Sequence, residues 1–131
     1  MIFTEGQIFE HIFVVSDEIY NGFGSLFNDR NPLHTDEEFA RNKGFRGAVM
    51  YGNILNGFLS FFIGELLPTK HVIIHSQEIN YKNAVYINDK LNFKATVEGV
   101  FESVNVVEFK YSFVNEDKKT VAKGKISIGI I

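Results

Sequence analysis

Cysteine is absent from the 131 residues of the sequence. Its absence excludes thiolate nucleophiles, cysteine-ligated zinc or iron–sulfur centres, and a disulfide framework. The first residues, Met-Ile-Phe-Thr-Glu-Gly, contain no basic segment, and Glu5 stands where a secretory signal would be apolar. Nothing here favours export, so cytoplasm is the expected location.

An excess of positive charge and a long apolar run are also missing. Thirteen Lys and Arg residues against sixteen Asp and Glu residues give a net charge of -3, which argues against binding to the phosphates of nucleic acid. The longest apolar stretch, residues 54–67, is broken by Asn56, Gly57, Gly64 and Glu65. It is shorter than the about 20 residues of a membrane-spanning helix. We expect neither a nucleic-acid partner nor a membrane span.

Only two prolines occur, Pro32 and Pro68, and the pattern changes at each. Before Pro32, β-branched and aromatic residues at 7–15 predict a strand. Ser16 with two acidic residues after it predicts the N-terminus of a helix, whose apolar spacing continues until residues 29–32. The sequence thus begins with a strand followed by a helix.

Two further helices are predicted between the prolines. Thr35 and Glu38 have capping-box spacing, which indicates a short helix through about Arg41. Residues 48–67 are apolar on nearly every side and too long for one strand. A helix of this kind must be wrapped by the rest of the fold.

After Pro68 the hydrophobic period changes from helical to alternating. Segments 72–81, 91–100, 104–114 and 120–131 are rich in β-branched and aromatic residues, and turn-forming residues separate them. The spacing predicts antiparallel hairpins. We therefore expect an α+β fold in which residues 1–131 form one domain, with an antiparallel sheet curled around a long central helix.

The densest polar cluster is the segment 28–36, Asn-Asp-Arg-Asn-Pro-Leu-His-Thr-Asp. Asp29 and His34 lie five residues apart around a rigid proline, so both side chains can face one small volume. Such a pair suits proton transfer, since His titrates near neutrality and a carboxylate can act as a base. The alternative is structural: Asp29 caps local backbone amides and His34 is an ordinary surface residue.

This cluster resembles the signature of the MaoC-like dehydratases and (R)-specific enoyl-CoA hydratases. The resemblance rests on the intact Asp-x-Asn-Pro-Leu-His core within residues 23–34, with Ala40 six residues after the histidine. Residues 47–55, Gly-Ala-Val-Met-Tyr-Gly-Asn-Ile-Leu, resemble the start of the family's central helix. Residues 81–91 resemble its aromatic-x-x-Pro-Val-x-x-Gly-Asp-x-Leu pattern. The resemblance implies a hot-dog fold and assembly into homodimers.

The family also implies an activity, the interconversion of trans-2-enoyl and (R)-3-hydroxyacyl thioesters. Asp29 and His34 would hold the water that is added or lost, and the backbone N–H of Gly52 would bind the thioester carbonyl. Asn31 and Tyr51 are also expected to contact the substrate. No cofactor is implied, because coenzyme A or phosphopantetheine enters only as part of the substrate.

The sequence departs from the family pattern next to these residues. Phe27 and Asn28 replace a small residue and a glycine before Asp29, and Tyr51 replaces a common histidine. Phe27 either narrows the acyl cavity or turns into the core. These departures keep two alternatives open: a hot-dog acyl thioesterase, and a noncatalytic acyl-binding or heterodimer subunit.

All three arginines, Arg30, Arg41 and Arg46, fall close to the motif in an otherwise acidic chain. Arg suits phosphate recognition, so this patch would bind coenzyme A phosphates or an acyl carrier protein. Salt bridges to the acidic residues at 36–38 are the alternative. No metal site is expected, because His71 and His75 flank a strand-like segment that holds them about 13 Å apart.

Overall fold

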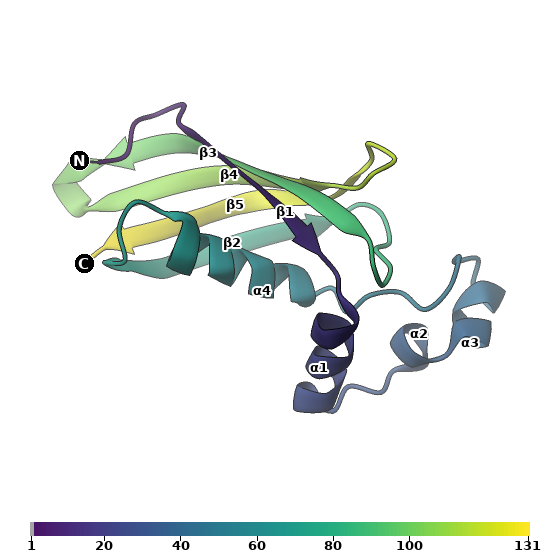
Figure 1. Ribbon diagram of the computed structural model, residues 1–131. Helices are drawn as coiled ribbons and strands as arrows, with labels where there is room; N and C mark the ends of the chain where they lie inside the picture. Colours follow the sequence, from purple (N-terminus) through teal and green to yellow (C-terminus); the bar gives the residue numbers. More distant parts are fainter. Residues whose placement is uncertain (1) are drawn as a thin grey trace.

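Five antiparallel strands form a single curved sheet in the order β1-β3-β4-β5-β2 (Figure 1). The computed structural model describes residues 2–131. The elements are β1 (Ile8–Val14), α1 (Asp17–Phe27), α2 (Pro32–Thr35), α3 (Glu37–Asn42), α4 (Ile54–Phe61), the π-helical turn η1 (Phe62–Leu66), β2 (Val72–Tyr81), β3 (Lys90–Phe101), the 3-10 turn η2 (Glu102–Val104), β4 (Val106–Val114) and β5 (Thr120–Ile130). The predicted α+β class and the four strands after Pro68 are confirmed.

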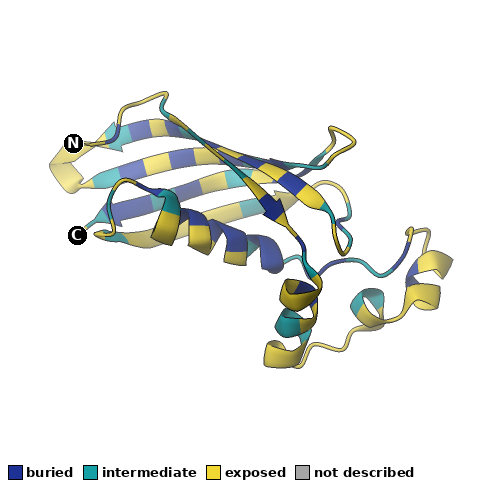
Figure 2. Ribbon diagram, in the orientation of Figure 1, coloured by how far each residue is buried: buried dark blue, intermediate teal, exposed yellow. Residues whose placement is uncertain are grey.

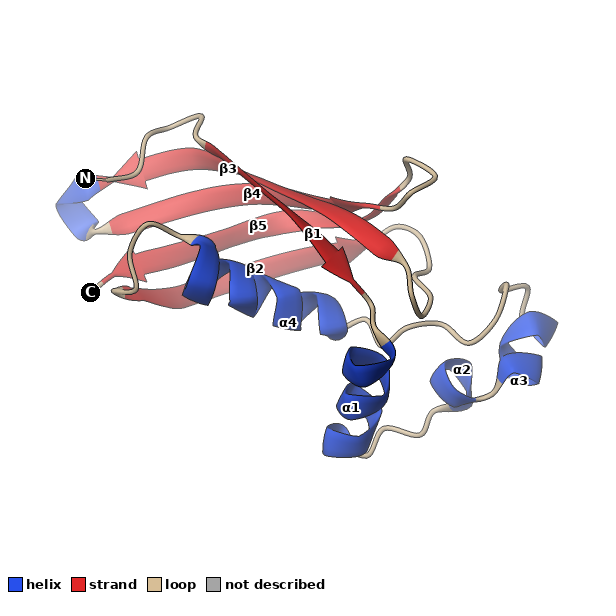
Figure 3. Ribbon diagram, in the orientation of Figure 1, coloured by secondary structure: helices blue, strands red, loops and turns tan. Residues whose placement is uncertain are grey.

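The core lies between the sheet and α4, which runs along one face of the sheet (Figure 3). Alternate residues of β3 and β4 point to this face and are buried, as their period of two requires. Phe62 of η1 is fully buried, and its ring centroid lies 4.9 Å from that of Phe93 and 5.4 Å from that of Phe109. Each such side chain contributes about 1.5–3 kcal/mol on burial. This packing fixes the position of α4 on the sheet.

The central helix is shorter than the sequence predicts. α4 has 8 residues and η1 adds 5, whereas residues 48–53 form a loop. In this loop the backbone N–H of Val49 donates to Leu33 O (2.9 Å) and that of Met50 to Val85 O (2.8 Å). These amides connect the loop to neighbouring segments, so they are not available to a helix. One face of α4, including Gly57 and Phe61, is exposed (Figure 2).

The segment α1–α3 projects from one end of the sheet (Figure 1). Ser16 caps α1 as predicted, since its hydroxyl accepts from Ile19 N at 3.2 Å. The cap of α3 was predicted at Thr35 but is Asp36, whose carboxylate accepts from Phe39 N at 3.1 Å. The hydroxyl of Thr35 instead donates to Asn31 O (3.2 Å) within α2. Thr35 is therefore the last residue of α2 and not the residue that begins α3.

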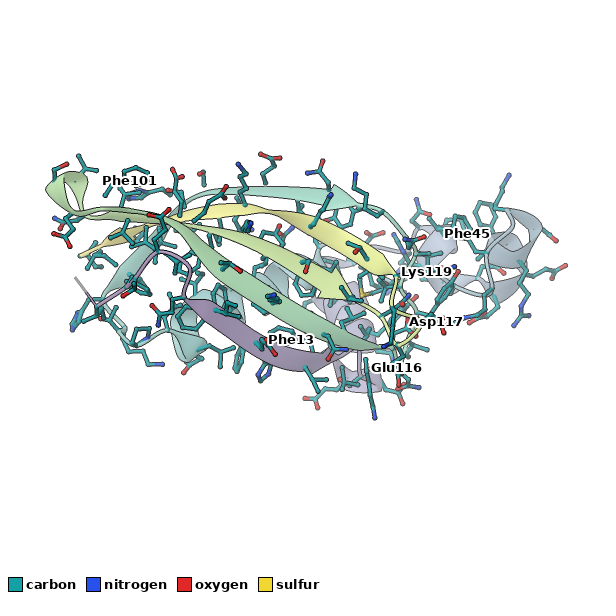
Figure 4. The ribbon with its side chains drawn as sticks, turned by 90° about the horizontal axis from the view of Figure 1, so that it is seen from above. Phe13, Phe45, Phe101, Glu116, Asp117 and Lys119 are labelled. Carbon is teal, nitrogen blue, oxygen red and sulfur yellow. The ribbon has the colours of Figure 1, made fainter. Side chains whose placement is uncertain are left out.

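The projecting segment shares its end of the sheet with the β4–β5 turn. Figure 4 shows this turn, marked by Glu116, Asp117 and Lys119, on the same side as Phe45, while Phe101 lies at the far end of β3. Phe13 lies along β1 between these ends. No helix within residues 2–131 is both long and apolar enough to cross a bilayer.

Candidate active site

A cavity of about 1480 Å³ opens between β1, α1 and α4. Its wall is mainly apolar and includes phenylalanines from all three elements. Asp29, His34, Tyr51 and Gly52 also line it. The fold therefore brings the two predicted catalytic residues together with two of the predicted substrate contacts, beside a space suited to an apolar chain.

Each polar residue of the Asp-x-Asn-Pro-Leu-His motif has a local task. The Oδ1 of Asp29 accepts from the backbone N–H of Asn31 (3.1 Å), and the Oδ1 of Asn31 accepts from Leu33 N (2.9 Å), which caps α2. Pro32 occupies the first turn of α2, where its missing N–H costs nothing. These bonds fix the conformation of the loop that joins Asp29 to His34. They also commit the side-chain oxygen of Asn31, predicted to bind substrate, to the backbone.

The tautomer of His34 follows from its contact with Val49. The Nδ1 of His34 lies 2.6 Å from Val49 O, and a carbonyl only accepts, so Nδ1 carries the proton. In neutral histidine the Nε2 atom is then the unprotonated nitrogen. It has no hydrogen-bond partner within residues 2–131. His34 is thereby prepared to accept a proton at Nε2.

Two tyrosine hydroxyls hold the backbone of the same two residues. Tyr20, from α1, donates to His34 O at 2.6 Å, and Tyr51, from the loop before α4, donates to Asp29 O at 3.0 Å. The Tyr51 ring also lies 4.4 Å from the His34 ring. Both tyrosines are buried. We call this pair, Tyr20 and Tyr51, the tyrosine clamp.

Burial keeps both clamp hydroxyls protonated. Burial, with smaller contributions from Tyr51 and Glu37, raises the pKa of Tyr20 to about 12. The pKa of Tyr51 is also raised, first by burial and then by the negative charge of Asp29, while Arg30 acts in the opposite direction. A hydroxyl whose pKa is raised remains a hydrogen-bond donor throughout the neutral range.

Gly52 has both a packing role and a free donor. A Cβ at this position would lie 3.2 Å from two ring atoms of Tyr81, so a side chain here would require the Tyr81 ring to shift by a few tenths of an ångström. Its N–H precedes α4 and has no partner within residues 2–131. A free amide at a helix N-terminus is suited to bind an oxygen that gains negative charge.

The two residues before Asp29 fit the loop in different ways. Asn28 caps α1 in the left-handed conformation, with φ 55. Asparagine is the residue that most readily replaces glycine in this conformation. Phe27 is 69% exposed and lines the cavity, and its ring centroid lies 4.8 Å from that of Phe23 with the two rings tilted by 47°. Of the two placements expected for Phe27, the one in the core is wrong.

A second cavity, of about 530 Å³, shares Asp29, His34 and Tyr51 with the first. Its other lining residues are mostly polar and include Arg30 and Glu37. The catalytic pair thus lies between an apolar and a polar space. Within residues 2–131 no group of three or more His, Asp or Glu side chains is arranged to hold a metal ion.

The three arginines do not share one position. Arg30 lines the second cavity, and its Nε donates to Asn28 Oδ1 at 3.0 Å. Arg41 pairs with Glu37 at 3.5 Å, and Arg46 pairs with Asp89 at 3.2 Å. Arg41 and Arg46 line neither of these two cavities. The structure therefore brings only Arg30 close to the catalytic pair.

Sequence reasoning missed three contributors: Tyr20, the carbonyl of Val49, and Tyr81. Tyr20 falls on the apolar face of α1, where a hydroxyl needs a partner, and this was a usable signal. Tyr81 was present only as an aromatic position in the third motif. The role of Val49 belongs to its backbone, so no side-chain pattern announces it.

The comparisons agree with this geometry. A family profile described as "MaoC like domain" matches residues 7–123. The (R)-specific enoyl-CoA hydratase of Rhodospirillum rubrum is 29% identical over 106 residues, which are 81% of this chain and 74% of that protein. The mitochondrial 3-hydroxyacyl-[acyl-carrier-protein] dehydratase of Arabidopsis thaliana is 26% identical over 92% of this chain and 73% of its own.

The fold has a close counterpart among solved structures. The (R)-hydratase from A. caviae superimposes with a TM-score of 0.90 at 22% identity, covering 99% of this chain and 98% of that one. This likeness confirms the expected hot-dog fold. With the profile match spanning most of the sequence, the chain belongs to the MaoC-like domain family.

Proposed function

We propose that this protein interconverts trans-2-enoyl and (R)-3-hydroxyacyl thioesters by adding or removing water. The single observation that carries the proposal is the convergence of Asp29, His34 and the free N–H of Gly52 on one largely apolar cavity. The relatives named as hydratases and dehydratases support the same chemistry. The protein is then an enzyme. Its reaction requires no resident cofactor, because the thioester carries its own coenzyme A or phosphopantetheine arm.

The cavity orients the substrate from its two ends. The acyl chain lies among the phenylalanines of β1, α1 and α4, where apolar burial binds it. The thioester carbonyl oxygen accepts from the N–H of Gly52. The polar second cavity, with Arg30, then lies on the side of the phosphate-bearing arm of the thioester. This arrangement places the Cα–Cβ double bond beside Asp29 and His34.

The catalytic pair takes one proton from the water and returns one proton to the substrate. A water held between the Asp29 carboxylate and Nε2 of His34 forms a bond from its oxygen to Cβ and loses one proton to the pair. The electrons of the double bond move toward the carbonyl, whose oxygen becomes an enolate stabilised at Gly52. The pair returns one proton to Cα, so its protonation is unchanged after a turnover. Dehydration follows the reverse path.

The absorbance of crotonyl-CoA at the enoyl band tests this function. We expect the absorbance to fall when the protein is added, with no free thiol appearing in a parallel thiol titration. Thiol release without loss of the enoyl band would instead identify a thioesterase. No change in either signal would contradict both enzymatic readings and favour a noncatalytic subunit.

We also propose that the chain forms a homodimer. β2 is an edge strand of the sheet, and it exposes the large side chains of Ile73 and Ile74. An unpaired edge with exposed apolar residues favours pairing with another strand. Light scattering at micromolar concentration tests the assembly, and a monomer there would overturn it.

A further inference from the structure

Tyr81 has a hydroxyl without a partner beside the proposed oxyanion donor. It is the last residue of β2 and lines the large cavity. The sequence has five tyrosines. Tyr20, Tyr51 and Tyr111 each donate to a backbone carbonyl, and the Tyr86 hydroxyl accepts from Arg46 N. Only the hydroxyl of Tyr81 has no hydrogen-bond partner within the described residues 2–131.

The hydroxyl lies close enough to Gly52 for both groups to bind one oxygen atom. A Cβ built on Gly52 would be 3.4 Å from the Tyr81 hydroxyl oxygen. Because N and Cβ of one residue are about 2.5 Å apart, the hydroxyl oxygen and Gly52 N are separated by less than about 6 Å. One carbonyl oxygen that accepts two hydrogen bonds of about 2.8–3.0 Å along its two lone pairs holds the donors about 5 Å apart, which lies within this bound.

The chemical state of Tyr81 fits a donor. Burial raises its pKa, so the hydroxyl keeps its proton at neutral pH. The residue is nevertheless 51% exposed, so a substrate can reach it. A phenol at a cavity wall with no internal acceptor is available for a ligand.

We propose that Tyr81 is a catalytic residue whose hydroxyl donates, together with the N–H of Gly52, to the carbonyl oxygen of the thioester. The two donors stabilise the negative charge that this oxygen gains when water adds to Cβ. The inference rests on the proposed function, because that function supplies the carbonyl. It adds a second donor from β2, an element that contributes neither Asp29 nor His34.

The substitution Tyr81→Phe removes one oxygen atom and keeps the ring that packs on Gly52. We expect kcat for crotonyl-CoA hydration to fall by about 10- to 100-fold, the effect of losing one hydrogen bond to a developing charge. KM should change less than about threefold, since the bond strengthens mainly in the transition state. Tyr111→Phe is the matched control, because Tyr111 also loses a hydroxyl but lines neither cavity. Its kcat per folded molecule should stay at the wild-type value.

A spectroscopic measurement separates this inference from the proposed function. Butyryl-CoA is saturated and cannot be hydrated, so the infrared carbonyl band of its ¹³C-labelled thioester reports binding without turnover. We expect a shift to lower wavenumber on the wild-type protein and a smaller shift on Tyr81→Phe. An equal shift on both, or a kcat of Tyr81→Phe within twofold of wild type, would overturn the inference. A wild-type protein that shifts the band but hydrates nothing would overturn the proposed function, and a smaller shift on Tyr81→Phe would then support only the contact of Tyr81 with the carbonyl.

Discussion

Gly24 and Tyr51 should show strong energetic coupling, because the hydroxyl of Tyr51 occupies the space that a side chain at Gly24 would need. A Cβ at Gly24 would collide with that hydroxyl oxygen and would lie 3.1 Å from ring atom Cζ. Gly24→Ala alone therefore combines an overpacking cost of about 1–3 kcal/mol with a gain of about 0.5–1 kcal/mol in helix propensity within α1. We expect net destabilisation.

In the Tyr51→Phe background, Gly24→Ala should no longer destabilise the protein. Tyr51→Phe alone loses the bond to Asp29 O and costs about 0.5–1.5 kcal/mol. In its background the colliding oxygen is gone, and a small ring shift relieves the remaining contact, so Gly24→Ala becomes neutral or stabilising. The coupling free energy should be about 1–3 kcal/mol.

Urea unfolding of the wild type, both single variants and the double variant measures this coupling. Hydration rates of the same four proteins then show whether the clamp positions Asp29: Tyr51→Phe should lower kcat more than it raises KM. Effects on stability that add to within about 0.5 kcal/mol would refute the proposed contact.

Three other outcomes are expected. Phe27→Ala enlarges the cavity and should raise the ratio of kcat/KM for a ten-carbon enoyl-CoA to that for a four-carbon enoyl-CoA by about 3- to 10-fold. An unchanged ratio would show that Phe27 does not contact the acyl chain. The stability that Tyr20 gains from its raised pKa is fully present below about pH 10, the unfolded value, and is lost as the pH rises toward about 12. Tyr20→Phe should therefore flatten the alkaline fall in unfolding free energy, and an equally steep fall would contradict this assignment. Arg30→Gln should raise KM for a coenzyme A thioester by about fivefold at low salt and by less at high salt, whereas a salt-independent change would indicate a role in the loop rather than in phosphate binding.

The sheet was predictable because its signal is periodic. In β3 and β4 every second residue is buried, so composition and alternation specify both the strands and the face that meets α4. The predicted helix at 48–67 was too long because apolar character does not reveal where backbone amides find other partners. The backbone amides of Val49 and Met50 donate to carbonyls outside any helix, but the side chains are apolar and therefore fit the pattern of a buried helix.

The candidate site was predictable where it depends on neighbours in sequence. Asp29 and His34 lie on one short loop whose turn chemistry is written in the motif itself. The tyrosine clamp joins residues 14 and 22 positions apart, and a pattern within one segment does not contain such contacts. The arginines show that closeness in sequence does not ensure a shared site. They are close in sequence, yet Arg41 and Arg46 pair with Glu37 and Asp89 instead of lining the cavities.

The rate of crotonyl-CoA hydration by Asp29→Asn, beside the wild type and His34→Ala, tests whether these two residues activate the water. If this pair holds and activates one water, each substitution should lower kcat by at least about 100-fold. Asp29→Asn keeps an oxygen that can accept from Asn31 N, so its circular dichroism should remain native. A variant with native circular dichroism and near wild-type turnover would contradict the assignment of Asp29 and His34 as the acid–base pair.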